Sequence, residues 1–293
     1  MYKTVYLLPL LLSVACASPA LETPVMEKIP GPESRLMLEG HLTQGGLLIG
    51  RTVPGARVEY GEYTPRVSPE GVFIVGFGRD AELKQSIRLV GPDGKSETHV
   101  IDLAGREYEV QHVDGLPQEK VTPPKKEWDR IARESELIKN ARSNDAERSD
   151  FLKGFIWPAE GIVSGVYGSQ RILNKVPKRP HYGLDVAAPT GTPAKAPAPG
   201  IITLTHSGMF YTGGTIVIDH GHGLSSIFMH LSRIDVKEGD TVAQGQPVGA
   251  IGSTGRATGP HLHWGLYWFN TPLDPRLLLP TRNPPKLTTS KKK

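Results

Sequence analysis

Short apolar segments separated by turn-forming residues fill the first part of the chain. Between about residues 35 and 115, runs such as GGLLIGRTV, GVFIVGF and SIRLVGP alternate with Gly, Pro and Asp-Gly steps. Short strands joined by tight turns predict a small antiparallel β-sandwich over residues 35–115. The histidines of this segment, His41, His99 and His112, occur singly, and no acid, base and nucleophile gather around them. We therefore assign this accessory domain no chemistry.

A charged segment with helical periodicity follows over residues 123–152. Its few large apolar residues recur at roughly helical spacing among many charged ones and form one narrow stripe. The stripe consists of Trp128, Ile131, Ile138 and Ala141. Such a stripe predicts a helical linker that rests on a neighbouring element. A coiled coil that binds a partner is the alternative, but the segment lacks the repeated heptads of that structure.

The strand-like pattern returns from about residue 153 to residue 281, with many Gly and Pro residues between the apolar runs. Seven of the ten histidines lie between His181 and His263. The sequence thus predicts a mainly β protein, in which a helical linker joins the N-terminal β-sandwich to a C-terminal domain of antiparallel β-sheet. We expect the chemistry of the protein in the C-terminal domain.

The stretch TGPHLHWGLYW, residues 258–268, places two histidines two positions apart in an apolar, aromatic run. Alternate residues of a strand point to the same face, so His261 and His263 project together while Leu262 and Trp264 take the other face. Packing alone seldom pairs two titratable rings, because each needs a hydrogen-bond partner and two protonated rings repel each other. A pair of structural histidines remains the alternative at this point.

A histidine and a carboxylate share a second stretch, RPHYGLDVAAP, in which Pro180 and Gly183 disfavour a helix. On extended chain the even separation of His181 and Asp185 places both side chains on one face. With a histidine from another strand they make three nitrogen and oxygen ligands. This is the donor set of a catalytic zinc site that keeps a fourth position open for water. The pattern points to such a site without being sufficient for it.

Three motifs, HYGLD, FMHLS and GPHLHWGL, occur in this order in the C-terminal part of the chain. With these separations they resemble the motifs of lysostaphin/LytM-type zinc metallopeptidases, which cut peptide bonds in bacterial cell-wall peptidoglycan. The resemblance covers roughly residues 157–273 and includes all five polar residues of the motifs. It implies a LytM-like metallopeptidase domain over residues 153–281 and a zinc-dependent endopeptidase that acts on peptidoglycan peptides.

The resemblance also implies roles for five residues. His181, Asp185 and His263 would hold Zn²⁺, whereas His230 and His261 would line the substrate side without binding the metal. Zinc lowers the pKa of a bound water from 15.7 to about 7 and polarises the scissile carbonyl. A neutral imidazole at His230 or His261 would then move protons during catalysis. The sequence leaves open which of the two histidines acts as the base.

Other residues of this region are weaker candidates. His220 and His222, in DHGHG, follow the strand-like GTIVID and fall in a predicted turn, which would hold a metal poorly. We expect neither of them, nor His206, to bind the catalytic metal, and we expect His220 to pack or hydrogen-bond beneath the site. The basic loop Arg171–Arg179 and Tyr211 are expected to shape the substrate cleft, with ordinary solvated turns as the alternative.

Two other functions compete with the peptidase. Residues 236–252, VKEGDTVAQGQPVGAIG, resemble the hairpin of biotinyl and lipoyl carrier domains, yet no lysine for modification occurs between Glu238 and Gly252. A non-catalytic LytM-like domain that activates another wall hydrolase is the other alternative, but such relatives typically lack the zinc ligands. For an active enzyme, we expect the N-terminal domain to position or regulate it, and direct cross-links containing diaminopimelate are favoured over glycine bridges.

The chain begins with Met-Tyr-Lys and the apolar run Val5–Ala15, which predicts a signal peptide over residues 1–17 and export to the periplasm or cell envelope. Cleavage after Ala17 is one interpretation, and lipidation of Cys16 with attachment to the membrane is the other. Because Cys16 is the only cysteine, an internal disulfide is excluded. The net charge of +4, with a basic tail over residues 282–293, is too small to predict nucleic-acid binding. The oligomeric state stays open.

Overall fold

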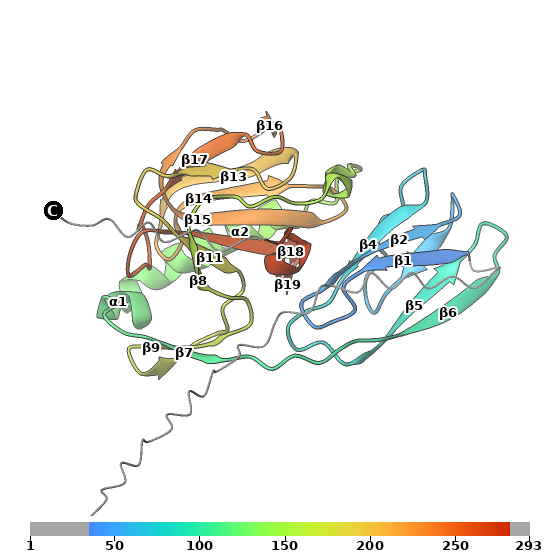
Figure 1. Ribbon diagram of the computed structural model, residues 1–293, viewed down its shortest axis with the longest axis horizontal. Helices are drawn as coiled ribbons and strands as arrows, with labels where there is room; N and C mark the ends of the chain where they lie inside the picture. Colours follow the sequence, from blue (N-terminus) through green and yellow to red (C-terminus); the bar gives the residue numbers. More distant parts are fainter. Residues whose placement is uncertain (1–34, 282–293) are drawn as a thin grey trace, which may run out of the picture.

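The computed structural model describes residues 35–281 of the chain (Figure 1). The described residues form mainly β-strands, and the one long helix among them is α2 (Trp128–Arg142). The predicted mainly β fold is thus confirmed. The predicted signal peptide, the lipidation site at Cys16 and the basic tail lie outside the described residues. Within residues 35–281, no helix has the length and apolar character that crossing a membrane requires.

The N-terminal part is a sandwich of two three-stranded antiparallel sheets, with strand orders β1-β2-β4 and β3-β5-β6 (Figure 1). The strands are β1 (Leu36–Gly40), β2 (Leu47–Thr52), β3 (Arg57–Glu59), β4 (Val72–Gly76), β5 (Lys84–Val90) and β6 (Ser96–Asp102). In β5, Ile87 and Leu89 are buried while Ser86 and Arg88 are exposed. Because side chains alternate with a period of two residues, one face of the sheet packs into the core and the other faces solvent.

The C-terminal part is built on a ten-stranded sheet whose main path has the order β16-β13-β14-β15-β18-β11-β8. Its paired strands are antiparallel, as predicted. The elements are β8 (Ile162–Gly165), β11 (Leu184–Ala187), β12 (Pro193–Lys195), β13 (Gly200–Met209), β14 (Gly213–Asp219), β15 (Leu224–Ile234), β16 (Thr241–Val242), β17 (Pro247–Ile251), β18 (His261–Trp268), β19 (Thr271–Leu273) and the 3₁₀ turn η3 (Pro275–Leu278). Most residues of β15 and β18 are buried, so these strands are a firm support for functional side chains.

The predicted helical linker is also present, but its long helix is shorter than the expected segment 123–152. The linker contains α1 (Gln118–Val121), η1 (Lys125–Glu127), α2 and η2 (Asp150–Lys153). Ile138 and Ala141 of α2 pack against the cluster that contains Leu204 and Val217, on β13 and β14. Trp128, at the start of the predicted apolar stripe, is 56% exposed. Only the second half of the stripe therefore rests on the sheet.

The segment between the sandwich and the linker also crosses to the C-terminal part. In it β7 (Val110–Val113) pairs in parallel with β9 (Gln170–Leu173), which in turn pairs with β10 (Val176–Pro177). Residues 171–179, expected to be a loop, thus form a short hairpin in which Asn174 at the turn has left-handed backbone, φ 45°. The expectation of a plain loop is wrong because the strand that supports this hairpin comes from a distant part of the sequence.

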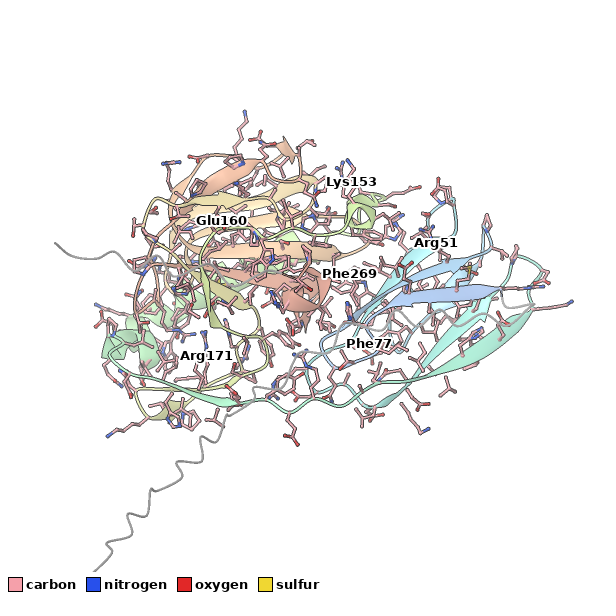
Figure 2. The ribbon with its side chains drawn as sticks, viewed as in Figure 1. Arg51, Phe77, Lys153, Glu160, Arg171 and Phe269 are labelled. Atoms are coloured by element: carbon pink, nitrogen blue, oxygen red, sulfur yellow. The ribbon has the colours of Figure 1, made fainter. Side chains whose placement is uncertain are left out.

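The two β parts meet in one continuous core. The ring of Trp268, at the end of β18, lies 4.8 Å from the ring of Tyr63 and 6.0 Å from that of Tyr60. Phe77 lies at the same junction on the sandwich side, and Phe269 lies there on the C-terminal side (Figure 2). Core residues of both parts belong to a single cluster. The division of the chain at residues 35–115 and 153–281 therefore stays a prediction about folding units.

Candidate metal centre and substrate cleft

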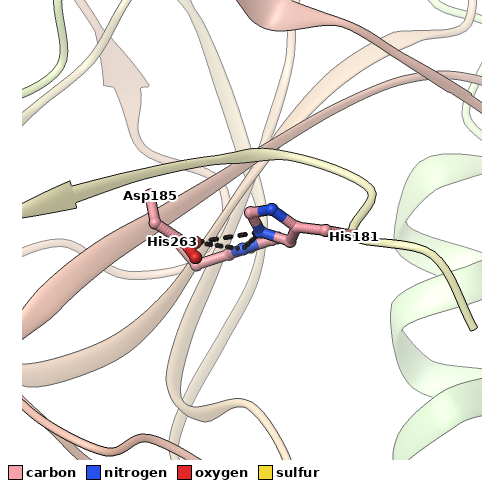
Figure 3. A group of neighbouring side chains, drawn as sticks. All are labelled: His181, Asp185 and His263. Carbon is pink, nitrogen blue, oxygen red and sulfur yellow. Dashed lines mark hydrogen bonds and ion pairs between the residues drawn. The ribbon is translucent and has the colours of Figure 1, made fainter. Parts of the chain in front are cut away.

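Three side chains converge at one point of the C-terminal sheet (Figure 3). Nε2 of His181 lies 3.0 Å from Oδ1 of Asp185 and 3.0 Å from Nδ1 of His263, and the last two atoms are 2.8 Å apart. All three side chains are buried. The structure therefore brings together the three residues that the motifs identify as metal ligands.

The pairing of β11 with β18 explains this arrangement. Asp185 on β11 lies directly opposite His263 on β18 in the antiparallel register, so the two side chains leave the sheet on the same face. His181 precedes β11 and lies outside the strands, where its backbone N–H donates to the carbonyl of Ser169. The strand predicted here thus covers residues 184–187 only, and backbone hydrogen bonds to Gly168 and Ser169, just before β9, hold His181 in place.

The hydrogen bond at Nδ1 of His181 favours a cation between the three converging atoms. Nδ1 of His181 lies 2.9 Å from the carbonyl oxygen of Val166 and donates to it, because a carbonyl can only accept. In neutral His181, Nε2 then carries a lone pair that faces a lone pair of Asp185 Oδ1. These two acceptors repel each other unless a proton or a metal ion lies between them. Two imidazole nitrogens and one carboxylate oxygen fit Zn²⁺, and the carbonyl behind His181 is typical of a ligand histidine.

The protonation states suit a metal site as well. Burial alone would raise the pKa of Asp185, but His181 and His263, which when protonated carry positive charge and donate to the carboxylate, outweigh it and hold that pKa well below its usual value. Burial lowers the pKa of His263 to about 4, although the Asp185 carboxylate opposes this shift. A metal needs an ionised aspartate and neutral histidines as ligands.

The other carboxylate oxygen of Asp185 is occupied by Arg171. Nη2 of Arg171, on β9, donates to Oδ2 at 2.7 Å. Asp185 therefore faces the two histidines with Oδ1 alone. The arginine also balances the negative charge of a carboxylate that would otherwise be buried beside neutral imidazoles.

His230 and His261 form a second pair of rings next to the three ligand positions. Their ring centroids are 4.7 Å apart, and Nε2 of His261 lies 3.9 Å from Asp185 Oδ1. Nδ1 of His230 donates to the carbonyl of Thr254 at 2.8 Å, and Nδ1 of His261 donates to that of Gly259 at 2.9 Å. When neutral, both rings thus carry the lone pair on Nε2. Burial, followed by the neighbouring His261, lowers the pKa of His230 to about 3.

An irregularity in β15 aims His230 at this site. Met229 pairs with His263 on β18, whereas Leu231 pairs with Ile251 on β17. His230 lies at the change of partner and has φ 65°, a left-handed conformation that is rare for a residue other than glycine. Its N–H donates to the carbonyl of Thr212 instead of joining the ladder. The register of β15 with its neighbours thus shifts at the residue that the FMHLS motif contributes.

A cleft of about 520 Å³ opens onto the cluster. Its lining includes His181, His230, His263 and Tyr211. A smaller hollow of about 140 Å³ lies beside it and contains Asp185 and His261 in its lining. The two hollows share Arg171, Leu173, His230 and Arg256. A substrate in the cleft would therefore meet the ligand cluster, the histidine pair and two arginines.

The remaining histidines lie elsewhere. His220 and His222 are in the turn between β14 and β15, and His206 is on β13, where its Nδ1 accepts from the N–H of Gly208. His220 hydrogen-bonds to the carbonyl of Pro199 and to the hydroxyl of Ser226, as the sequence led us to expect. The turn itself is buried, which the sequence did not indicate. Its rings pack against Phe151 and Phe155, which come from η2 and the segment after it.

Sequence reasoning missed one charged residue of the cleft. Arg256 lies in the loop between β17 and β18, and its guanidinium carbon is 4.5 Å from the centroid of the Tyr211 ring. Its position follows from a hydrogen bond between its N–H and the carbonyl of Tyr211, at 2.8 Å. The only signal in the sequence was its place five residues before the HLH pair, which is too weak to assign a role.

Comparison with known proteins agrees with this site. Residues 179–275 match the model of peptidase family M23. Peptidoglycan DD-endopeptidase ShyA of Vibrio cholerae is 45% identical over 98 residues, which are 33% of this chain and 23% of ShyA. DD-carboxypeptidase/endopeptidase Mpg of Neisseria meningitidis is 42% identical over 115 residues, 39% of this chain and 26% of Mpg. The matched part of the chain spans about a quarter of the length of these curated relatives.

A solved structure matches more of the chain. A crystal structure assigned to peptidase M23 from Pseudomonas aeruginosa has 28% sequence identity and a TM-score of 0.62, and the match covers 81% of this chain and 94% of that chain. The likeness therefore extends beyond the family domain into the N-terminal part. The C-terminal part of the chain belongs to peptidase family M23, of the lysostaphin/LytM type, as the three motifs predicted.

Proposed function

We propose that the protein is a zinc-dependent endopeptidase that hydrolyses peptide cross-links of bacterial peptidoglycan. The observation that carries this proposal is the convergence of His181 Nε2, Asp185 Oδ1 and His263 Nδ1, all within 4.8 Å of one another, beside a cleft. In this proposal the three residues hold Zn²⁺ and leave a position open toward the cleft.

The chemistry divides between the metal and the histidine pair. Zinc, when bound, would polarise the scissile carbonyl and make a water molecule acidic enough to be a nucleophile near neutral pH. Nε2 of His261 or His230 accepts the proton of the attacking water and passes a proton to the leaving nitrogen. The geometry of both imidazoles fits this role, because a backbone carbonyl fixes Nδ1 of each as the donor and leaves Nε2 available. The pKa of His230, which burial lowers to about 3, makes this ring the weaker proton acceptor near neutral pH.

The substrate class is inferred from the relatives. ShyA and Mpg are named as a peptidoglycan DD-endopeptidase and as a DD-carboxypeptidase/endopeptidase. Their likeness to this chain supports peptide bonds of peptidoglycan as its substrate. Export to the periplasm or cell envelope follows from that substrate and from the predicted signal peptide. The mass of the mature N-terminus tests the last step, because cleavage after Ala17 and lipidation of Cys16 give different masses.

The test of the activity uses purified sacculi with zinc, with and without a chelator, followed by identification of the released muropeptides. The wild-type protein should release peptides by opening cross-links, and the chelator should abolish the release. Asp185→Asn should lose both zinc and cleavage, because an amide is a much poorer zinc ligand than a carboxylate. The matched control is Asp235→Asn, since Asp235 lies on the surface and forms an ion pair with Arg233, away from the cleft.

This experiment also separates the enzyme from the alternative of a non-catalytic activator. If the protein is an activator, its Asp185→Asn variant should bind and stimulate another hydrolase as well as the wild-type protein does. Uncleaved cross-links after incubation with the zinc-loaded wild-type protein would overturn the proposed activity. The N-terminal sandwich, which shares a core with the peptidase part, is proposed to position or regulate the enzyme.

A further inference from the structure

The walls of the cleft are strongly basic. Of the side chains that line the larger cleft, four are cationic and none is a carboxylate. The cationic residues are Arg171, Lys178, Arg179 and Arg256. In the smaller hollow the one carboxylate is Asp185, which already bonds to Arg171. The described surface that a substrate would touch therefore carries an excess of positive charge.

Arg256 is a half-buried charge in this group. Its guanidinium stacks over Tyr211, and Nη1 reaches the carbonyl of Lys120 only at 3.5 Å. Among residues 35–281, no carboxylate lies within ion-pair distance of it. Burial lowers the pKa of Arg256, and the positive charge of Arg171 lowers it further. An arginine in this environment gains much from an anion that enters the cleft.

Arg171, which comes from another element than Arg256, adds a second group of hydrogen-bond donors to the cleft. One Nη2 hydrogen is used by Asp185, and the buried Nε has no hydrogen-bond partner in the part of the chain that the structure describes. Arg171 comes from β9 and Arg256 from the loop before β18, yet both line both hollows together with His230. An anion held between the two arginines would therefore lie beside the histidine pair that we propose to move protons.

We propose that Arg256, with Arg171, forms a subsite for a free carboxylate on the carbon that bears the leaving nitrogen of the substrate. This inference rests on the proposed function. It defines the substrate as a peptide whose scissile amide is followed at once by a carboxylate. A terminal D-alanine and a cross-linked diaminopimelate both satisfy this condition. A glycine bridge does not, because its next carbonyl is an amide.

The reaction itself needs no other partner. Water adds its oxygen to the scissile carbonyl carbon, the C–N bond breaks, and the leaving nitrogen takes a proton to become an amine. The carboxylate is unchanged in this step. A bidentate contact between a guanidinium and this carboxylate would orient the leaving nitrogen toward the histidines. It would also select against substrates with an uncharged group in place of the carboxylate.

The experiment compares an N-acylated D-alanyl-D-alanine peptide with the same peptide as its C-terminal carboxamide. The affinity of each peptide is first measured on the metal-free protein by NMR titration, so that zinc cannot bind the carboxylate. The free acid should bind at least about tenfold more tightly to the wild-type protein. Arg256→Gln should bring the two affinities close together. The matched control Arg233→Gln, at a surface arginine paired with Asp235, should keep the tenfold difference.

Hydrolysis of the two peptides by the zinc-loaded protein is the second readout. The ratio of the two kcat/KM values should fall from about ten to near one in Arg256→Gln and should be largely kept in Arg256→Lys. Equal affinities for acid and amide in the wild-type protein would overturn the carboxylate subsite, whether or not Arg256→Gln folds. If neither peptide nor cross-linked muropeptides are cleaved while the affinity difference persists, the proposed function fails and the subsite stands.

Discussion

Arg171 donates a hydrogen bond from Nη2 to Oδ2 of Asp185 at 2.7 Å, while Oδ1 of the same carboxylate faces His181 and His263. Because the arginine occupies Oδ2, only Oδ1 of Asp185 is available to a metal. It also fixes the rotation of the carboxylate, since a bond at one oxygen limits where the other can point. Arg171 belongs to β9, a strand that neither β11 nor β18 pairs with.

Arg171→Ala should weaken zinc binding by roughly 10- to 100-fold, the usual effect of removing a group that orients a metal ligand. The affinity can be measured by competition with a chromophoric chelator. Arg171→Lys should lose less zinc affinity than Arg171→Ala, because lysine keeps the positive charge. Its affinity should still be below that of the wild-type protein, because lysine lacks the planar guanidinium. Arg233→Ala is the control at a surface ion pair. An unchanged zinc affinity in Arg171→Ala would show that β11 alone orients Asp185.

Local periodicity was enough to predict the strand around His261 and His263. Alternation on a strand places His261 and His263 on one side, and the structure has both residues in β18 with Asp185 opposite His263. The mainly β fold, the linker helix and the sandwich also follow from patterns within short windows of sequence. These features depend on neighbours a few residues away, which a single sequence displays directly.

Other parts of the site depend on contacts between distant segments. The position of His230 depends on β15 changing its partner from β18 to β17, and no local pattern in FMHLS encodes that change. The hairpin that carries Arg171 is supported by β7. The burial of the turn at His220 and His222 depends on Phe151 and Phe155. Such pairings are set by the whole fold, so sequence patterns alone do not predict them.

His261→Ala and His230→Ala should each lower kcat by about 10²- to 10⁴-fold, the range expected for the loss of a general acid or base. Both variants should still bind one zinc ion, because neither ring belongs to the converging group His181, Asp185 and His263 that is proposed to hold it. Atomic emission measures the zinc content, and hydrolysis of a muropeptide measures kcat. Both measurements are made on the same preparation of each variant. Loss of zinc together with activity in either variant would assign that histidine to the metal.

Gly183→Ala should disturb the metal centre without changing a ligand. A Cβ on Gly183 would lie 2.6 Å from Cε1 and 2.7 Å from Nε2 of His263, and 2.6 Å from the carbonyl oxygen of Trp264. The imidazole would have to move, so zinc affinity and kcat should both fall by at least about tenfold. Gly208→Ala is the matched control, since a Cβ there meets nothing within 4 Å. Normal zinc affinity in Gly183→Ala, measured as above, would mean that the backbone moves instead of the ring.

The buried His220 should make folding stability depend on pH. Burial lowers the pKa of His220 to about 4, from an ordinary value of 6.5 that applies in the unfolded chain. As the pH falls below 6.5, the unfolded chain therefore binds a proton that the folded protein does not accept until about pH 4. The contribution of neutral His220 to the free energy of unfolding is therefore fully present above pH 6.5. It decreases as the pH falls, and near pH 4 it has decreased by about 3 kcal/mol.

A His220→Gln variant isolates this effect, because glutamine can hydrogen-bond to Pro199 and Ser226 but does not titrate. The variant should be less stable than the wild-type protein at pH 7, and the two free energies of unfolding should converge as the pH falls from 6.5 to 4. Urea denaturation of the metal-free proteins at several pH values measures both curves. The other titrating groups are common to the two proteins and cancel in the difference. Parallel curves would mean that His220 accepts a proton in the folded state as readily as in the unfolded chain.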